Sequence, residues 1–219
     1  MKNKLQFLKT HLLQIIIGFN YKKCVILTLC LVLNSCDDFV DVDLPASQLT
    51  SEQVFEDVVT ANAAMAGLYA KMRDGGILTG SSNGASCSLG LYADEFDYYY
   101  QASVSNFYNN ALFAGDLGVS DIWSTTYNQI YCANAVIEGL NNSSTITEAD
   151  KNQLQGEAIF IRALLHFYLL NLYGDIPYIA TTDYNENSNV SRIPTNEVYN
   201  MILMDLKKSI ELLSDSYAS

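Results

Sequence analysis

Residues 147–179 constrain the fold of this chain most, because they predict one long helix that is apolar almost all round. Its apolar residues recur at steps of three or four, with others beside them: Leu154, Ala158, Ile161, Leu165, Tyr168 and Leu172, flanked by Ile159, Leu164, Phe167 and Leu169. Such a helix is buried between other elements. Thr147 predicts its start, and Gly174 with Pro177 predicts its end. It would run ~40 Å and form the central rod of its domain.

Three further segments carry helical periodicity. The first runs from Ser51 to Gly75, the second from an N-cap at Ser120 to about Asn141, and the third follows Pro194. Their stripes are Val54, Val58, Ala61, Met65, Leu68 and Met72; Trp123, Tyr127, Ile130, Asn134, Ile137 and Leu140; and Val198, Ile202, Leu206, Ile210 and Leu213. The short connection 142–146 predicts an antiparallel hairpin between the second helix and the central one. The chain is therefore predicted to be all-α, built from helical hairpins.

Residues 75–118 form a different kind of segment, rich in Gly, Ser, Asn and Tyr and without a sustained period. They predict a long excursion with one short helix at residues 91–98. Loops of this length are uncommon inside compact domains and usually serve function. We therefore expect function here rather than on the long helices.

The N-terminal part has the pattern of a targeting segment. Lys22 and Lys23 precede an apolar run at residues 24–33, which is too short to span a bilayer as a mature helix. Leu33-Asn34-Ser35-Cys36 resembles a bacterial lipobox, although Asn34 departs from the usual small or apolar residue. The sequence thus predicts a signal peptide at residues 1–35, lipidation of Cys36, and an acidic tether at residues 36–50.

The remaining cysteines do not predict thiol chemistry. Cys24 and Cys30 would leave with the leader, so Cys87 and Cys132 remain in the mature chain. A disulfide between them is possible but not favoured, and no CxxC motif is present.

Charge excludes one class of partner. All 24 acidic residues follow Cys36, whereas five of the 12 basic residues precede it. A surface this negative repels phosphate backbones, so we expect no nucleic-acid binding.

Patterns for catalysis or metal binding are weak. Asp94, Glu95 and Asp97 invite comparison with the paired carboxylates of glycosidases, but acidic clusters on an acidic chain are usually solvated. His166 lies in the apolar helix and is interpreted as a core histidine. Residues 183–194 begin like a calcium loop, yet Ser188 and Pro194 stand where glycine and glutamate are required. We predict no catalytic residue, metal or cofactor.

The central segment carries a family resemblance. Glu157-Ala158, Arg162-Ala163, Tyr168 and the run Leu-Tyr-Gly-Asp-Ile-Pro at 172–177 resemble the helix-plus-GDxP segment of the SusD/RagB family, outer-membrane glycan-binding lipoproteins of Bacteroidetes. The residues around Tyr69, the Trp-x3-Tyr-x2-Ile-x3-Asn pattern that starts at Trp123 and the last helix are also similar. Family members are much longer, so the resemblance implies that residues 51–219 are a truncated N-terminal helical domain, from a fragment, split gene or degenerate copy.

The resemblance also implies a function. The protein would be a lipid-anchored, surface-exposed lipoprotein of the outer membrane with a tetratricopeptide-like helical arrangement. It would capture oligosaccharides without breaking a bond and deliver them to a SusC-like TonB-dependent transporter. Acidic residues just after Cys36 resemble a surface-export signal in such lipoproteins. The rival hypothesis is a helical interaction module that docks on the transporter and binds no sugar.

Candidate site residues lie in the excursion. A carbohydrate site needs flat aromatic side chains beside polar hydrogen-bonding groups, and residues 91–110 supply both. By the resemblance, the candidates are Tyr98, Tyr99, Tyr100 and Gln101, followed by Asn106 and Tyr108. Three successive tyrosines cannot all face one way, so at least one is expected in the core. Trp123 and Asn134 lie at core positions, the latter with backbone partners.

Overall fold

The computed structural model describes residues 51–99 and 105–215. Its helices are α2 (Ser51–Val54), α3 (Val58–Asp74), α4 (Ala85–Tyr92), α5 (Ser105–Tyr108), α6 (Leu117–Asn142), α7 (Glu148–Tyr173), α8 (Tyr184–Asn187) and α9 (Thr195–Leu212). Extended backbone in this part of the chain pairs only in one isolated bridge, Ile176 with Ile193. The all-α prediction is confirmed. Among the same residues no helix has the length and apolarity needed to cross a membrane.

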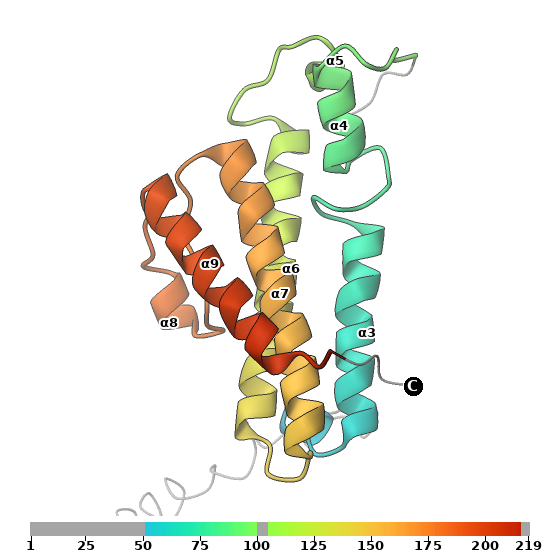
Figure 1. The fold of residues 1–219 in the computed structure, drawn as a ribbon. Coiled ribbons are helices and arrows are strands. Elements are labelled where there is room, and N and C mark those ends of the chain that lie inside the picture. Colours follow the sequence, from blue (N-terminus) through green and yellow to red (C-terminus); the bar gives the residue numbers. More distant parts are fainter. Residues whose placement is uncertain (1–50, 100–104, 216–219) are drawn as a thin grey trace, which may run out of the picture. The chain divides into compact units, whose positions relative to one another are not determined.

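Helix α7 is the central rod, as predicted from its apolar sequence. Thr147 caps its start and accepts a hydrogen bond from the Asp150 N–H at 3.3 Å, and Gly174 ends it. Figure 1 shows α6 running antiparallel to α7, with α9 on the other side of α7. Helix α3 packs against both α6 and α7.

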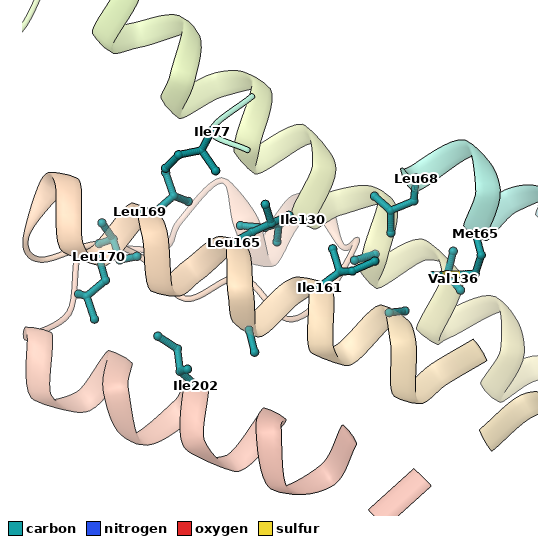
Figure 2. Packing of buried hydrophobic residues seen from close by; sticks show 14 of the residues in the cluster. Met65, Leu68, Ile77, Ile130, Val136, Ile161, Leu165, Leu169, Leu170 and Ile202 are labelled. Atoms are coloured by element: carbon teal, nitrogen blue, oxygen red, sulfur yellow. The ribbon is translucent and has the colours of Figure 1, made fainter. Parts of the chain in front are cut away.

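The interior is one apolar cluster between these four helices. Figure 2 shows Met65 and Leu68 of α3 gathered with Val136 of α6 and Ile161 of α7. Ile202 of α9 enters from the opposite side of α7. Burial of α7 side chains against α3, α6 and α9 explains most of its apolar residues, whereas Phe160 and Phe167 are 44% and 41% exposed.

Gly174 gives a testable consequence of how α7 ends. Its φ of 71° and ψ of −131° form a backbone conformation that is essentially restricted to glycine, while the space around its Cα is open. Gly174→Ala is therefore expected to lower the free energy of unfolding by ~1–3 kcal/mol, measured by urea denaturation. Gly67, exposed within α3 and equally open, is the matched control. Gly67→Ala should raise stability by up to ~1 kcal/mol; equal effects at both positions would contradict the backbone argument.

Two predicted helix starts are wrong, because aspartates cap the helices elsewhere. The helix expected from Ser51 is interrupted after Val54, and Asp57 starts α3 by accepting a hydrogen bond from the Val59 N–H at 2.9 Å. Helix α6 begins before Ser120, since Asp116 accepts from the Gly118 N–H at 2.8 Å. Short acidic side chains compete for backbone N–H groups and so fix helix starts.

The excursion and the later loop also differ from prediction. Residues 91–98 do not form a helix of their own: α4 ends at Tyr92, and the residues after it are not helical. The loop after Pro177 contains α8, whose N-cap Asp183 accepts from the Asn185 N–H at 2.7 Å. Asp183 is thus a helix cap. Cys87 and Cys132 are free thiols.

A buried polar network joins α6, α7 and α9. Arg162 forms an ion pair with Asp205, 2.7 Å from Nε to Oδ2, and donates to Asn134 Oδ1 at 2.9 Å. Asn134 is fully buried and donates to the Ile179 carbonyl at 3.2 Å, which confirms the prediction of backbone partners. His166 is fully buried too, as predicted.

The GDxP segment has a structural role at the start of α9. Asp175 Oδ1 accepts from both the backbone N–H and the hydroxyl of Thr195, each at 2.9 Å. The Pro177 carbonyl accepts from the Tyr127 hydroxyl at 2.8 Å. The segment therefore links the start of α9 to α6 and fixes how α9 returns against α7.

Candidate functional site

The excursion presents aromatic rings to solvent. Tyr99 is 86% exposed, Phe113 61%, Phe96 50% and Tyr92 46%. Figure 1 shows α4 and α5 beyond the C-terminal end of α3, where this segment lies. Exposed aromatic side chains gathered on one irregular segment are typical of a binding surface.

The candidate tyrosines take different positions. Tyr98 and Tyr108 are half-buried and their rings meet at 6.1 Å between centroids. Tyr99 points into solvent, and its hydroxyl donates to Asp97 Oδ2 at 3.3 Å. At least one successive tyrosine therefore contributes to packing, as expected. Tyr100 and Gln101 lie outside the described residues, as do the signal peptide, Cys36 and the tether.

Asn106 joins the short helix α5 to the start of α6. Its side-chain amide donates to Asp116 Oδ2 at 2.5 Å, while Asp116 also caps α6. Asp116 is 2% exposed, so this contact lies inside the segment. The hydrogen bond gives Asn106 a positioning role beside the exposed rings.

Phe96 was missed as a candidate, and the structure shows how its ring is held. A Cβ at position 90 would lie 2.3 Å from Phe96 Cε2, so the ring lies directly against Gly90 of α4. The ring is also half exposed. An aromatic ring with one side supported and the other open is a suitable platform for an apolar ligand surface. The sequence signal is a glycine six residues before an aromatic residue, which alone is not specific.

Asp94 and Asn110 shape the backbone on which these rings stand. Both have positive φ, 57° and 51°, and each follows the end of a short helix. After α4, the N–H groups of Asp94 and Glu95 donate to Leu91 and Gly90; after α5, those of Asn110 and Ala111 donate to Phe107 and Asn106. This is the Schellman pattern of helix termination. Asp94 therefore stabilises the local turn.

The acidic residues just after α4 are solvated. Asp94, Glu95 and Asp97 are all exposed. Across the described ranges, 51–99 and 105–215, no group of three His, Cys, Asp or Glu side chains is placed to hold a metal ion. The arrangement offers hydrogen-bond acceptors beside aromatic rings.

Trp123 lies in the core region, as its helical spacing predicts. Its ring packs 4.8 Å from that of Tyr127 and 4.9 Å from that of Tyr173, between centroids. The Arg192 guanidinium carbon lies 5.1 Å from its centroid. Trp123 is thus enclosed on several sides.

Comparison with known proteins agrees with this architecture. A family model described as starch-binding and associating with the outer membrane matches residues 38–219. SusD-like protein P2 of Formosa agariphila is 32% identical over 206 residues, 90% of this chain and 39% of the relative. The chain therefore spans about two fifths of the length of that curated relative.

Solved structures share the fold. A SusD-like protein of Bacteroides fragilis superposes with a TM-score of 0.60 at 26% identity, over 75% of this chain and 31% of that protein. A protein whose crystal structure was determined with a xylogluco-oligosaccharide gives a TM-score of 0.56 at 25% identity, over 72% of this chain and 30% of that one. The GDxP segment, the helical hairpins, the family model and these relatives agree, and the chain belongs to the SusD-like family.

Proposed function

We propose that this protein binds oligosaccharides at the exposed face of the excursion and does not cleave them. The observation that carries the proposal is the set of aromatic rings exposed beside polar side chains, above all Tyr99 next to Asp97 and Phe96 held on Gly90. Sugar rings present apolar C–H faces and hydroxyl edges, which match flat aromatic rings and hydrogen-bonding groups respectively.

The acidic sequence limits the charge of the proposed ligand. With 24 acidic and 12 basic residues overall, the chain repels anionic polymers. The proposed ligands are therefore neutral oligosaccharides. We include Tyr100 and Gln101 in the proposed site. Tyr98, Asn106 and Tyr108 would hold its backbone in place through their packing and hydrogen bonding.

The proposed location and partner are supported by family membership and by the lipobox-like residues 33–36. The family is associated with the outer membrane. We infer that Cys36 carries lipid, that the protein is anchored at the cell surface, and that it passes its ligand to a SusC-like TonB-dependent transporter.

Docking on that transporter without sugar binding is the second candidate. It is favoured by apolar side chains that α9 exposes to solvent: Met201, Leu203, Met204 and Ile210. Exposed apolar patches on a helix are typical of protein–protein contacts. The two candidates differ in what residues 92–113 do, which an experiment on Tyr99 separates.

Tyr99→Ala in the full chain is expected to weaken oligosaccharide binding about tenfold, because the most exposed ring of the site is lost. Binding is first detected on an array of neutral and acidic oligosaccharides and then measured by calorimetry. Tyr184 is the matched control, since it is 80% exposed but belongs to α8. Tyr184→Ala should bind like the unmodified chain. If the folded, unmodified chain binds no oligosaccharide, the docking role replaces the binding role.

A further inference from the structure

A cavity of about 440 Å³ lies beside the excursion, between α4, residues 112–114 and the adjoining ends of α6 and α7. This volume falls in the range of small-molecule sites. The lining is mostly apolar and includes the aromatic residues Tyr92, Phe107, Phe113 and Tyr173. The cavity therefore offers an apolar group, above all an aromatic one, a place out of water.

Two exposed aromatic residues connect this cavity to the proposed oligosaccharide surface. Tyr92 and Phe113 are 46% and 61% exposed, belong to that surface and also line the cavity. Leu89, 41% exposed, lies at the same opening. A group attached to an oligosaccharide on the surface can therefore enter the cavity, which makes the cavity an extension of the proposed site.

The polar side chains inside the cavity are not available to a ligand. The Ser88 hydroxyl is buried within the wall, and that residue is only 1% exposed. The Tyr173 hydroxyl donates to the Val119 carbonyl at 2.7 Å, and the Asn171 amide donates to the Phe167 carbonyl at 2.7 Å.

The hydroxyl of Tyr92, at the opening, is different. Tyr92 is half exposed, and its hydroxyl is not paired with any residue in the described part of the chain. A phenolic hydroxyl can donate one hydrogen bond and accept others. The available polar group thus lies at the mouth, while the interior is apolar.

This distribution disfavours two kinds of group in the interior. A bare sugar residue would bring several hydroxyls out of water with few side-chain partners, which costs free energy. A uronate or sulfate group would be buried without a counter-charge, because no charged residue is among the described residues that line the cavity. An uncharged apolar group, joined to the sugar by a polar linkage at the mouth, matches the cavity.

We propose that the cavity receives an aromatic acyl group esterified to the oligosaccharide, so that aryl esters of neutral oligosaccharides are the preferred ligands. This inference rests on the proposed function. The sugar chain lies on the exposed rings, and the aromatic ring of the ester enters between Phe107, Phe113 and Tyr173. The ester carbonyl at the mouth accepts a hydrogen bond from the Tyr92 hydroxyl. An acetyl ester would leave most of the aromatic walls uncovered and so bind less tightly.

The test uses an array of neutral oligosaccharides, each presented bare, with one acetyl ester and with one cinnamoyl ester. Native mass spectrometry of the full chain with equal amounts of the three forms then reports which form is bound. The cinnamoyl ester should bind about tenfold more tightly than the bare oligosaccharide, with the acetyl ester between them. Tyr92→Phe removes only the hydroxyl and should reduce this preference about threefold.

Two substitutions fill the cavity from different sides. Ala114→Trp adds a large ring at the exposed rim, and Val119→Phe adds one from the start of α6. Each should abolish the preference for the cinnamoyl ester and leave binding of the bare oligosaccharide within about twofold, which also shows that the variant is folded. Ala111→Trp is the matched control. It places the same side chain at an exposed position of the same loop, away from the cavity lining, and should keep the preference.

The outcomes separate this inference from the proposed function. Equal binding of all three forms by the unmodified chain, or an equal gain from the acetyl and cinnamoyl esters, overturns the aryl-ester inference alone. A preference that survives in both Ala114→Trp and Val119→Phe also overturns it, because the ester then binds elsewhere. If the folded, unmodified chain binds none of the forms, the proposed function fails and this inference fails with it.

Discussion

Asp205→Ala is expected to lower the free energy of unfolding by about 3 kcal/mol, because it leaves the Arg162 guanidinium buried without a counter-charge. Arg162 is 8% exposed and donates through Nε and Nη2 to the two carboxylate oxygens of Asp205, at 2.7 and 2.8 Å. The Tyr178 hydroxyl adds a further hydrogen bond to Asp205, at 2.5 Å. The substitution thus leaves three donors without this acceptor, Arg162 Nε and Nη2 and the Tyr178 hydroxyl.

A surface ion pair on the same helix provides the control. Glu211 lies 3.5 Å from Lys208, and both side chains are more than half exposed. Glu211→Ala should therefore change stability by less than ~1 kcal/mol. Urea denaturation of the full chain measures both variants. If Asp205→Ala costs no more than Glu211→Ala, the buried pair does not stabilise the contact between α7 and α9.

His166 is expected to make the protein less stable as the pH falls from about 6.5 to 4. Burial, with Arg162 nearby as a further cause, lowers the pKa of His166 from 6.5 to about 4. Its Nδ1 lies 2.9 Å from the Arg162 carbonyl, while its Nε2 accepts from the Ile179 N–H at 3.1 Å. The neutral ring satisfies both partners, whereas a proton on Nε2 would face a donor.

The direction of this pH dependence follows from whether the unfolded or the folded chain binds the proton at the higher pH. Above pH 6.5 the ring is neutral in both states, and its contribution to stability is fully present. As the pH falls toward 4, the unfolded chain takes up a proton that the folded chain does not, and ~3 kcal/mol is lost. Urea denaturation at several pH values in this window measures the loss.

His166→Gln separates this effect from the carboxylates, which titrate in both proteins. A glutamine can still accept from the Ile179 N–H but cannot be protonated in this range. The variant should start from a lower stability at pH 7 and lose ~3 kcal/mol less on acidification. Parallel pH profiles for the variant and the unmodified chain would show that His166 does not set the acid sensitivity.

The sequence was sufficient for the long helices because burial leaves a strong periodic pattern. Leu154, Ile161 and Leu165 are buried at the positions that the spacing predicts. Gly174 marks the end of α7 through a conformation that other residues avoid. Signals of this kind are local, so one sequence is enough to detect them.

The short elements depend on contacts that the sequence does not display. Asp94 and Asn110 end α4 and α5 with positive φ, a position where glycine is the usual marker. Asp116 starts α6 four residues before the expected cap because it is buried with Asn106 as a partner. Each choice between nearby caps is decided by tertiary packing.

The candidate site was predictable as a region but not residue by residue. Composition alone indicated the Tyr- and Asn-rich excursion. Tyr98 packs against the ring of Tyr108, whereas Tyr99 is exposed to solvent. Because the two tyrosines are adjacent, only one of them was expected to pack, but the sequence does not show which one. Phe96 depends on close approach to Gly90, and no local pattern specifies that contact.

The excursion joins α3 to α6, two helices that pack against each other whatever lies between them. The entropy cost of closing such a connection grows only with the logarithm of its length, and doubling roughly forty residues would cost only ~0.6 kcal/mol. Insertions, deletions and exchanges in this connection are therefore cheap for the scaffold. Under the proposed function, the residues that select the ligand can therefore change in this connection while α3, α6, α7 and α9 keep their packing.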